Sequence, residues 1–149
     1  MQKVVITGHD LTVDQIIAVC REGAEVVLSD ESREKILASR QVVNELVEER
    51  KVVYGITTGF GKFSDVVISQ DECKLLQKNL IITHAVGAGD PFKEDIARGI
   101  LLLRVNSLSN GFSGICLETV ETMIAMLNKG VTPFIPEKGS LGASGDLAP

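Results

Sequence analysis

The sequence predicts a mainly α-helical fold with a small β element near the N-terminus and two glycine-rich loops. Three observations carry this prediction. Apolar residues recur at helical spacing along most of the chain, two short runs of β-branched residues stand near the N-terminus, and glycines cluster at two places between the helical patterns. The 149 residues, of which 44% are hydrophobic and 23% charged, suit one folded domain with a sizeable core rather than a disordered chain.

The first thirty residues predict two short strands with a helix between them. Val4–Thr7 and Glu25–Ser29 are the β-branched runs. The segment Leu11–Gly23 is predicted to form one helix, because Thr12 and Gln15 have the spacing of a capping box and the segment ends on a glycine, where a C-terminal cap belongs.

Four further helices are predicted from the periodicity of the apolar residues. They cover residues 29 to about 51, about 70 to 84, 91 up to an interruption or kink at Gly111 and Gly114, and 117 to 130. Gly87 and Gly89 are expected to end the second of these helices, and Pro91 to open the third. The tail after residue 130 holds three prolines and three glycines in nineteen residues and therefore cannot be a regular helix.

Charge and composition exclude several classes of function. The net charge of -5, with Lys and Arg scattered singly, provides no basic surface for nucleic acid. The longest apolar runs, such as Gly99–Leu103, fall far short of the roughly 18 residues that a membrane helix needs, and no signal sequence begins the chain. Cysteines and histidines are isolated in sequence, so no metal site is expected, and the thiols are expected to be buried. We therefore expect a cytoplasmic protein that binds neither nucleic acid nor membrane.

Two glycine-rich segments invite a nucleotide-binding interpretation, which their spacing does not support. The segment Gly55–Lys62 has Ile56 where a phosphate-binding loop needs glycine. The segment Gly87–Gly89 is half of a dinucleotide fingerprint, with Phe92 in place of the third glycine. Both are better explained as structural turns.

Ser144 lies between small residues and could be a hydrolase nucleophile, with His84 as base and Asp146 as orienting acid. The nucleophile-elbow pattern does not match, because its second glycine comes one place early. Serine hydrolase and non-catalytic helical interaction domain both stay open as alternatives from other classes of protein.

Three strings together resemble the aromatic amino acid ammonia-lyase family. They are VYGITTGFG at residues 53–61, LQKNL at residues 76–80 leading to His84, and GSLGASGDLAP at residues 139–149. They occur in the order and at the spacing of that family, and the last string is highly specific. The resemblance implies the helical fold of the ammonia-lyases, with glycine-rich loops in the active site.

The resemblance also implies an electrophilic cofactor, a methylidene-imidazolone, made from Ala143, Ser144 and Gly145. The amide nitrogen of Gly145 attacks the carbonyl carbon of Ala143, and two waters are lost. Ser144 supplies the hydroxyl that leaves, and glycine suits the third position because it has no Cβ to obstruct a tight turn. Gly142 and Asp146 flank the tripeptide and are expected to support the cyclisation.

Two further residues match family positions. Tyr54 matches the catalytic tyrosine that transfers a proton, although outside this string we would interpret it as a packed core residue. His84 matches the position that contacts the substrate side chain, and histidine there points to elimination of ammonia from histidine, giving urocanate. An imidazole also bonds a phenol, so tyrosine ammonia-lyase and tyrosine aminomutase remain alternatives. We expect Tyr54 and His84 to lie near each other.

In the family, residues 1–149 correspond to the N-terminal portion of a longer, homotetrameric enzyme, here acting on L-histidine. Later residues of family members bind the substrate carboxylate and surround the cofactor. We therefore expect this chain by itself to be an inactive fragment in which Ala143, Ser144 and Gly145 stay uncyclised.

Overall fold

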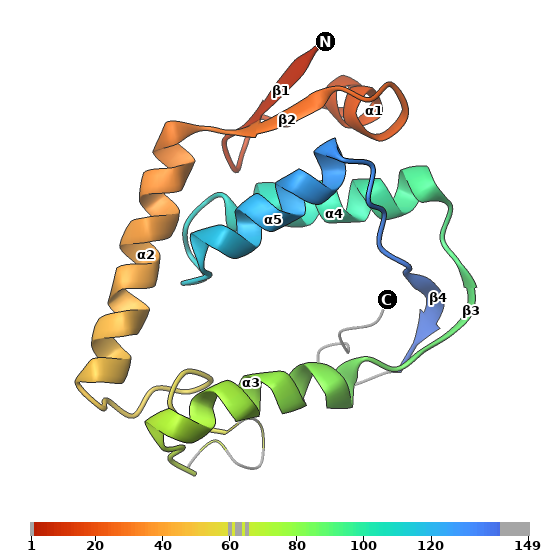
Figure 1. Cartoon of the computed structure of the whole chain (residues 1–149). Coiled ribbons are helices and arrows are strands. Elements are labelled where there is room, and N and C mark those ends of the chain that lie inside the picture. Colours follow the sequence, from red (N-terminus) through yellow and green to blue (C-terminus); the bar gives the residue numbers. More distant parts are fainter. Residues whose placement is uncertain (1, 60, 62–63, 65, 141–149) are drawn as a thin grey trace. The chain divides into compact units, whose positions relative to one another are not determined.

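The computed structural model describes residues 2–59, 61, 64 and 66–140. The chain forms two compact units (Figure 1). The first consists of Met1–Gln41 and Phe92–Phe134, and the second of Val42–Pro91 and Ile135–Pro149. The mainly helical architecture that the sequence predicts is confirmed.

The first unit begins with the predicted β element. Strands β1 (Lys3–Ile6) and β2 (Glu25–Leu28) pair in parallel, and the second and fourth residue of each strand are buried while the others face outward. Helix α1 (Val13–Arg21) joins them and begins at the predicted capping box, in which Thr12 and Gln15 exchange both hydrogen bonds. Parallel neighbours need a crossover connection, and α1 provides it here.

Three longer helices complete this unit. They are α2 (Asp30–Glu48), which continues into the second unit, α4 (Glu94–Leu108) and α5 (Leu117–Asn128). Helix α4 begins three residues later than predicted, because Pro91 belongs to a strand rather than to a helix start. It ends before Gly111 and Gly114, so these glycines interrupt the helical pattern and do not kink a continuous helix.

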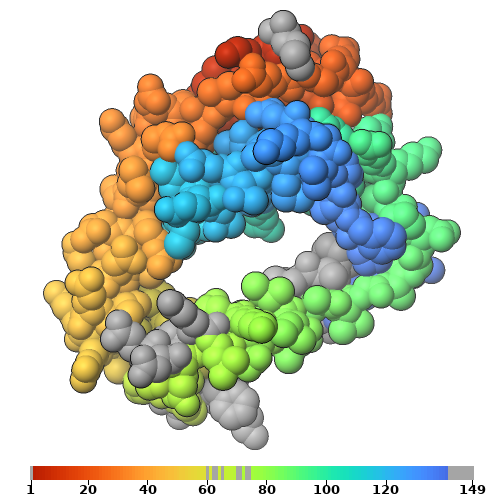
Figure 2. Space-filling view, in the orientation of Figure 1, coloured from red at the N-terminus to blue at the C-terminus, as the bar shows by residue number. Residues whose placement is uncertain are grey.

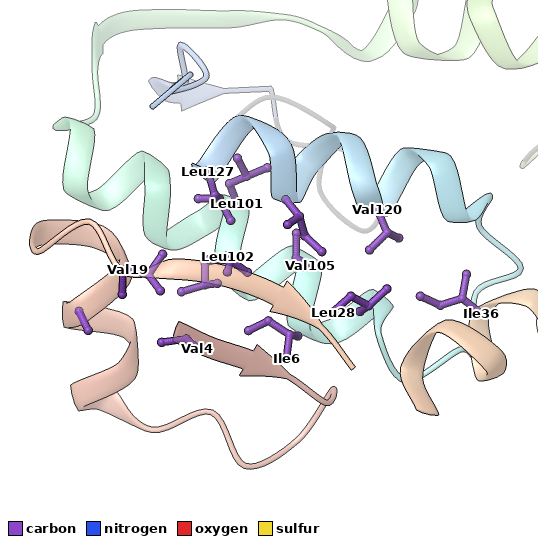
Figure 3. Close-up of a cluster of buried hydrophobic side chains, with 14 residues drawn as sticks. Val4, Ile6, Val19, Leu28, Ile36, Leu101, Leu102, Val105, Val120 and Leu127 are labelled. Atoms are coloured by element: carbon purple, nitrogen blue, oxygen red, sulfur yellow. The ribbon is translucent and has the colours of Figure 1, made fainter. Parts of the chain in front are cut away.

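One hydrophobic core fills the first unit (Figure 3). Its least exposed side chains come from the two strands, from α1 and α2, and from facing sides of α4 and α5. They are Val4, Ile6, Val19, Val26, Ile36, Leu102, Val105 and Val120. In the space-filling view the orange segment that contains β2 lies directly on the blue α5 (Figure 2). Burial of apolar area on this scale is the main stabilising term of the unit.

The second unit contains α3 (Gln70–His84) and two strands. Strands β3 (Gly87–Pro91) and β4 (Pro136–Gly139) pair antiparallel. Helix α3 has the bounds that the sequence predicts. The strands were not predicted, since Gly87 and Gly89 were expected only to end the helix and the tail only to be irregular.

Candidate active site

Tyr54 stands in a turn between α2 and α3 that a buried threonine holds. The turn is closed by a hydrogen bond from the Thr57 amide to the Val53 carbonyl. Thr57 Oγ1 accepts from the Val53 amide at 2.9 Å and donates to the Lys51 carbonyl at 2.5 Å. One hydroxyl thus satisfies two backbone groups that a loop would otherwise leave to water.

Thr58 continues this arrangement, and it is 1% exposed. Its hydroxyl accepts from the Gly55 amide at 3.3 Å and donates to the Gly59 carbonyl at 2.9 Å. The Tyr54 ring is largely exposed, and its phenol oxygen accepts a hydrogen bond from the Gly61 amide at 3.2 Å. The threonines of the 53–61 string therefore fix the backbone, and the glycine at its end fixes the phenol.

His84 is the last residue of α3 and is partly buried. Its Nδ1 lies 2.9 Å from the Leu80 carbonyl oxygen and 3.0 Å from Thr83 Oγ1. A carbonyl oxygen only accepts, so Nδ1 must carry the proton. The Thr83 hydroxyl can donate to the Asn79 carbonyl, at 2.9 Å, and still accept from Nδ1.

This tautomer decides what the other ring nitrogen of His84 can do. In a neutral imidazole with its proton on Nδ1, Nε2 is an acceptor. Nε2 makes no hydrogen bond within the described part of the chain. The carbonyl-capping role of a helix-end histidine is thus filled by Nδ1 alone, and Nε2 is available to a donor.

The structure does not bring Tyr54 and His84 together. The Tyr54 turn is attached to the segment that leads into α3, since the Ile68 amide donates to the Thr57 carbonyl at 2.9 Å. His84 lies at the other end of α3 (Figure 1). Its fifteen residues are separated by fourteen steps of about 1.5 Å, so the helix is about 21 Å long from first to last residue. The predicted proximity of the two side chains is therefore absent within this chain.

The predicted cofactor-forming residues lie outside the described residues. They are Gly142, Ala143, Ser144, Gly145 and Asp146. Strand β4 ends at Gly139, four residues before Ala143 in the sequence.

A mixed-charge cavity in the first unit was not predicted. It has a volume of about 650 Å³, and its lining includes Cys20, Arg21, Asp95 and Arg98. Arg21 is bonded to the Asp95 carboxylate, with both Nε and Nη2 at 3.0 Å from Oδ2. Burial raises the pKa of the Cys20 thiol, and the charge of Arg98 opposes this shift. No sequence pattern indicates this cavity, because its charged lining residues come from α1, β2 and α4, which are far apart along the chain.

Among the described residues no group of three or more His, Cys, Asp and Glu side chains could hold a metal ion, and no described helix combines the length and the apolar character needed to cross a membrane. Cys20 and Cys116 are free thiols but are only half-buried, so the expectation of buried thiols was wrong for these two.

Comparison with known proteins adds a family and several relatives. The profile described as "Aromatic amino acid lyase" matches residues 11–149. A histidine ammonia-lyase of Alkaliphilus oremlandii is 62% identical over all 149 residues, which span 29% of that relative's length.

Solved structures agree with this match. The histidine ammonia-lyase from Trypanosoma cruzi is 41% identical with a TM-score of 0.86, over 93% of this chain and 27% of that one. The tyrosine aminomutase from Streptomyces globisporus is 36% identical with a TM-score of 0.87, over 93% of this chain and 26% of that one.

Proposed function

The chain belongs to the aromatic amino acid lyase family, and from this premise we propose that its full-length parent is a histidine ammonia-lyase, which converts L-histidine to urocanate and ammonia. The observation that carries this proposal is His84, at the family's substrate-contacting position. The names and identities of the curated relatives agree with it, since histidine ammonia-lyases are 60% and 62% identical over the whole chain.

The tautomer of His84 supports a substrate with a hydrogen-bond donor on its ring. Nδ1 is committed to the Leu80 carbonyl, so Nε2 accepts. The imidazole N–H of histidine and the hydroxyl of tyrosine can both donate to it, whereas the ring of phenylalanine cannot. Activity on tyrosine, as an ammonia-lyase or an aminomutase, is therefore the second candidate function. The similarity of the chain to a tyrosine aminomutase structure supports this candidate.

The cofactor belongs to the same proposal. Ala143, Ser144 and Gly145 have the chemistry that a methylidene-imidazolone requires, namely a hydroxyl to eliminate and a third residue without a Cβ. Once formed, this group supplies an electrophile that ordinary side chains lack. Gly142 and Asp146, on either side, are proposed to support its formation.

Tyr54 is proposed to transfer the proton that the elimination removes from the substrate carbon. Its phenol oxygen accepts a hydrogen bond from the Gly61 amide, which holds the ring in place, and the residue is 61% exposed, so a ligand can still approach it. His84 orients the substrate ring, and Tyr54 acts at the reacting carbon. Proton transfer by a positioned side chain contributes about 10²–10⁴-fold to rate.

The separation of Tyr54 and His84 supports an oligomer with shared sites. A helix of about 21 Å lies between their attachment points, which is more than one amino acid substrate spans. We therefore propose that a site takes Tyr54 from one chain and His84 from another, within a homotetramer. Cys20 and Cys116 are free thiols, as expected in a reducing compartment, and we therefore propose that the enzyme is located in the cytoplasm.

The test uses the full-length enzyme in two steps. Turnover of L-histidine is compared with that of L-tyrosine and L-phenylalanine; faster turnover of tyrosine would replace histidine ammonia-lyase by the second candidate. Absence of any lyase activity would favour an interaction domain, and labelling of Ser144 by a fluorophosphonate would favour a hydrolase.

The second step mixes chains carrying Tyr54→Phe with chains carrying His84→Leu. Each variant alone should be inactive. Random mixing restores about a quarter of the sites if the two residues come from different chains, and none if they come from the same chain. Recovery of activity in the mixture therefore separates a shared site from a site within one chain.

A further inference from the structure

Helix α4 is apolar on two opposite sides. Its inner side supplies buried leucine and valine side chains to the core of the first unit. Its outer side carries Ile96, Ile100 and Leu103, at the i, i+4, i+7 spacing of one helical face, and each of them is 41–50% exposed. A surface helix is normally apolar on one side only, and a helix that is apolar on both sides is normally buried. The outer side of α4 therefore lacks a cover in this structure.

Helix α1 turns this apolar side into a groove. It packs against α4 within the first unit, and its Ile17 is also exposed. The groove between the two helices has a volume of about 370 Å³, and both helices contribute isoleucines to it. Its only charged lining residues among those that the structure describes are Arg21 and Asp95, which are bonded to each other. An occupant of this groove must therefore be apolar where it touches the walls.

Gly99 lies in the lining of the groove, in the middle of α4. Glycine is unfavourable inside a helix. The fold of the first unit does not require it, because a Cβ at position 99 would meet only Cys20 Sγ, at the ordinary contact distance of 3.7 Å. The missing side chain leaves the backbone of α4 open to close approach from the groove. A partner that packs against this backbone explains a glycine that the local packing does not need.

The concave shape argues against the same face of a second copy as the occupant. In a two-fold contact a patch meets itself. Two grooves placed face to face would leave their floors unfilled, whereas stable interfaces are packed as densely as protein interiors. A single helix with an apolar face is convex and fits a groove between two helices.

The length of the relatives indicates where such a helix comes from. The 149 residues span 29% of a curated relative, so more than two thirds of an enzyme of that length lies outside them. We propose that an apolar helix from this remaining part of the parent enzyme docks in the α1–α4 groove, against Ile100, Leu103 and Gly99. The inference requires an enzyme of the family's length and is independent of the amino acid on which it acts.

The first experiment measures how fast Leu103→Cys reacts with N-ethylmaleimide in the folded full-length enzyme, relative to the same variant in urea, with peptide mass as the readout. We expect a slowing of about 100-fold, because a covered side chain reacts only after local opening. Arg104→Cys is the matched control, since the next residue of α4 is exposed and does not line the groove, and it should be slowed far less. Equal slowing factors at positions 103 and 104 with both under about 10-fold would show an open groove and overturn the proposal.

A crosslink identifies the occupant without any substitution. The full-length enzyme is produced with photo-leucine, which replaces leucine with little change in shape, and is irradiated. The peptide that contains Leu103 should be joined to a peptide from outside residues 1–149. A crosslink from Leu103 to residues 1–149 of a second copy would overturn the proposal in favour of an interface between copies of this unit.

A second position keeps the labelling test decisive if Leu103→Cys gives no folded enzyme. Ile17 lines the groove from α1, so Ile17→Cys should show the same protection. Reaction of a folded Ile17→Cys enzyme within about 10-fold of its rate in urea would count against a docked helix. Turnover of histidine is measured separately, because an enzyme that is inactive on histidine but protected at these positions refutes the proposed function and leaves this inference standing.

Discussion

The side-chain amide of Asn128 makes both of its hydrogen bonds to the backbone of a single residue, Val26. Asn128 Oδ1 accepts from the Val26 amide and Nδ2 donates to the Val26 carbonyl, each at 2.8 Å. The amide thereby takes the place of a neighbouring strand at the open edge of β2. It fastens the last residue of α5 to the β element.

Replacing Asn128 by Ala should destabilise the protein by about 2 kcal/mol, because two partly buried backbone groups of Val26 lose their partner. The measurement is urea unfolding followed by circular dichroism. Asn128→Asp serves as the comparison, since it keeps an acceptor for the Val26 amide and loses only the donor. Equal stability of Asn128→Ala and the unaltered protein would contradict the interpretation.

Arg98 should contribute more to stability. The residue is 8% exposed, and its guanidinium donates to the Val19 carbonyl at 2.9 Å and the Leu127 carbonyl at 3.2 Å, in the last turns of α1 and α5. Arg98→Met keeps a long side chain but leaves both carbonyls without this donor. We therefore expect the free energy of unfolding to fall by about 3 kcal/mol. The exposed Arg104 of the same helix is the control, and its change to Met should cost under about 0.5 kcal/mol.

The sequence predicted those parts of the fold that are specified locally. The capping box at Thr12 lies within four residues, and the two β-branched runs correspond to strands β1 and β2. The β3–β4 pair was missed for a physical reason. Its strands are about 45 residues apart, mostly exposed and rich in glycine and proline, so neither alternation nor β propensity marks them.

The same distinction applies to the candidate site. The string at residues 53–61 identified Tyr54, and its threonines turn out to hold the turn. The predicted helix from 70 to 84 was correct, and its length already separates its two ends by about 21 Å. The sequence could not show the backbone hydrogen bond from Ile68 to Thr57. This bond attaches the Tyr54 turn near the start of α3, whereas His84 is the last residue of that helix.

Cys20 should react slowly with iodoacetamide. Burial raises the pKa of its thiol above the ordinary 9.0, although Arg98 partly offsets the shift. Only the thiolate reacts, so at pH 8 alkylation should be slower in the folded protein than in the same chain in urea. The pKa of Cys20 is higher in the folded than in the unfolded protein. Its contribution to the free energy of unfolding is therefore fully present below the unfolded pKa and is lost as the pH rises through the folded pKa. Equal rates, read by peptide mass, would contradict this.

Tyr54→Phe in the full-length enzyme should lower kcat by about 10²–10⁴-fold with a smaller change in KM, because the phenol oxygen is proposed to transfer a proton and not to bind the substrate. Thr57→Ser is the matched control in the same turn, since it keeps the hydroxyl that bonds Val53 and Lys51. A Tyr54→Phe enzyme with an unchanged kcat would remove Tyr54 from the catalytic step.

The last prediction concerns a polypeptide made of residues 1–149 only. We expect Ala143, Ser144 and Gly145 to stay uncyclised in it, even though they cyclise in the proposed full-length enzyme. The chain spans 29% of its curated relatives, so most of the structure that would press the Gly145 nitrogen against the Ala143 carbonyl is not supplied.

The position of the tripeptide within this polypeptide works in the same direction. Gly145 stands four residues from the last residue of the polypeptide, and ordering a chain end into one reactive geometry costs about 1–2 kcal/mol per residue in backbone entropy. Intact-mass measurement decides the matter, because an uncyclised chain keeps the mass calculated from its sequence. A polypeptide lighter by two waters would show that residues 1–149 suffice to build the cofactor.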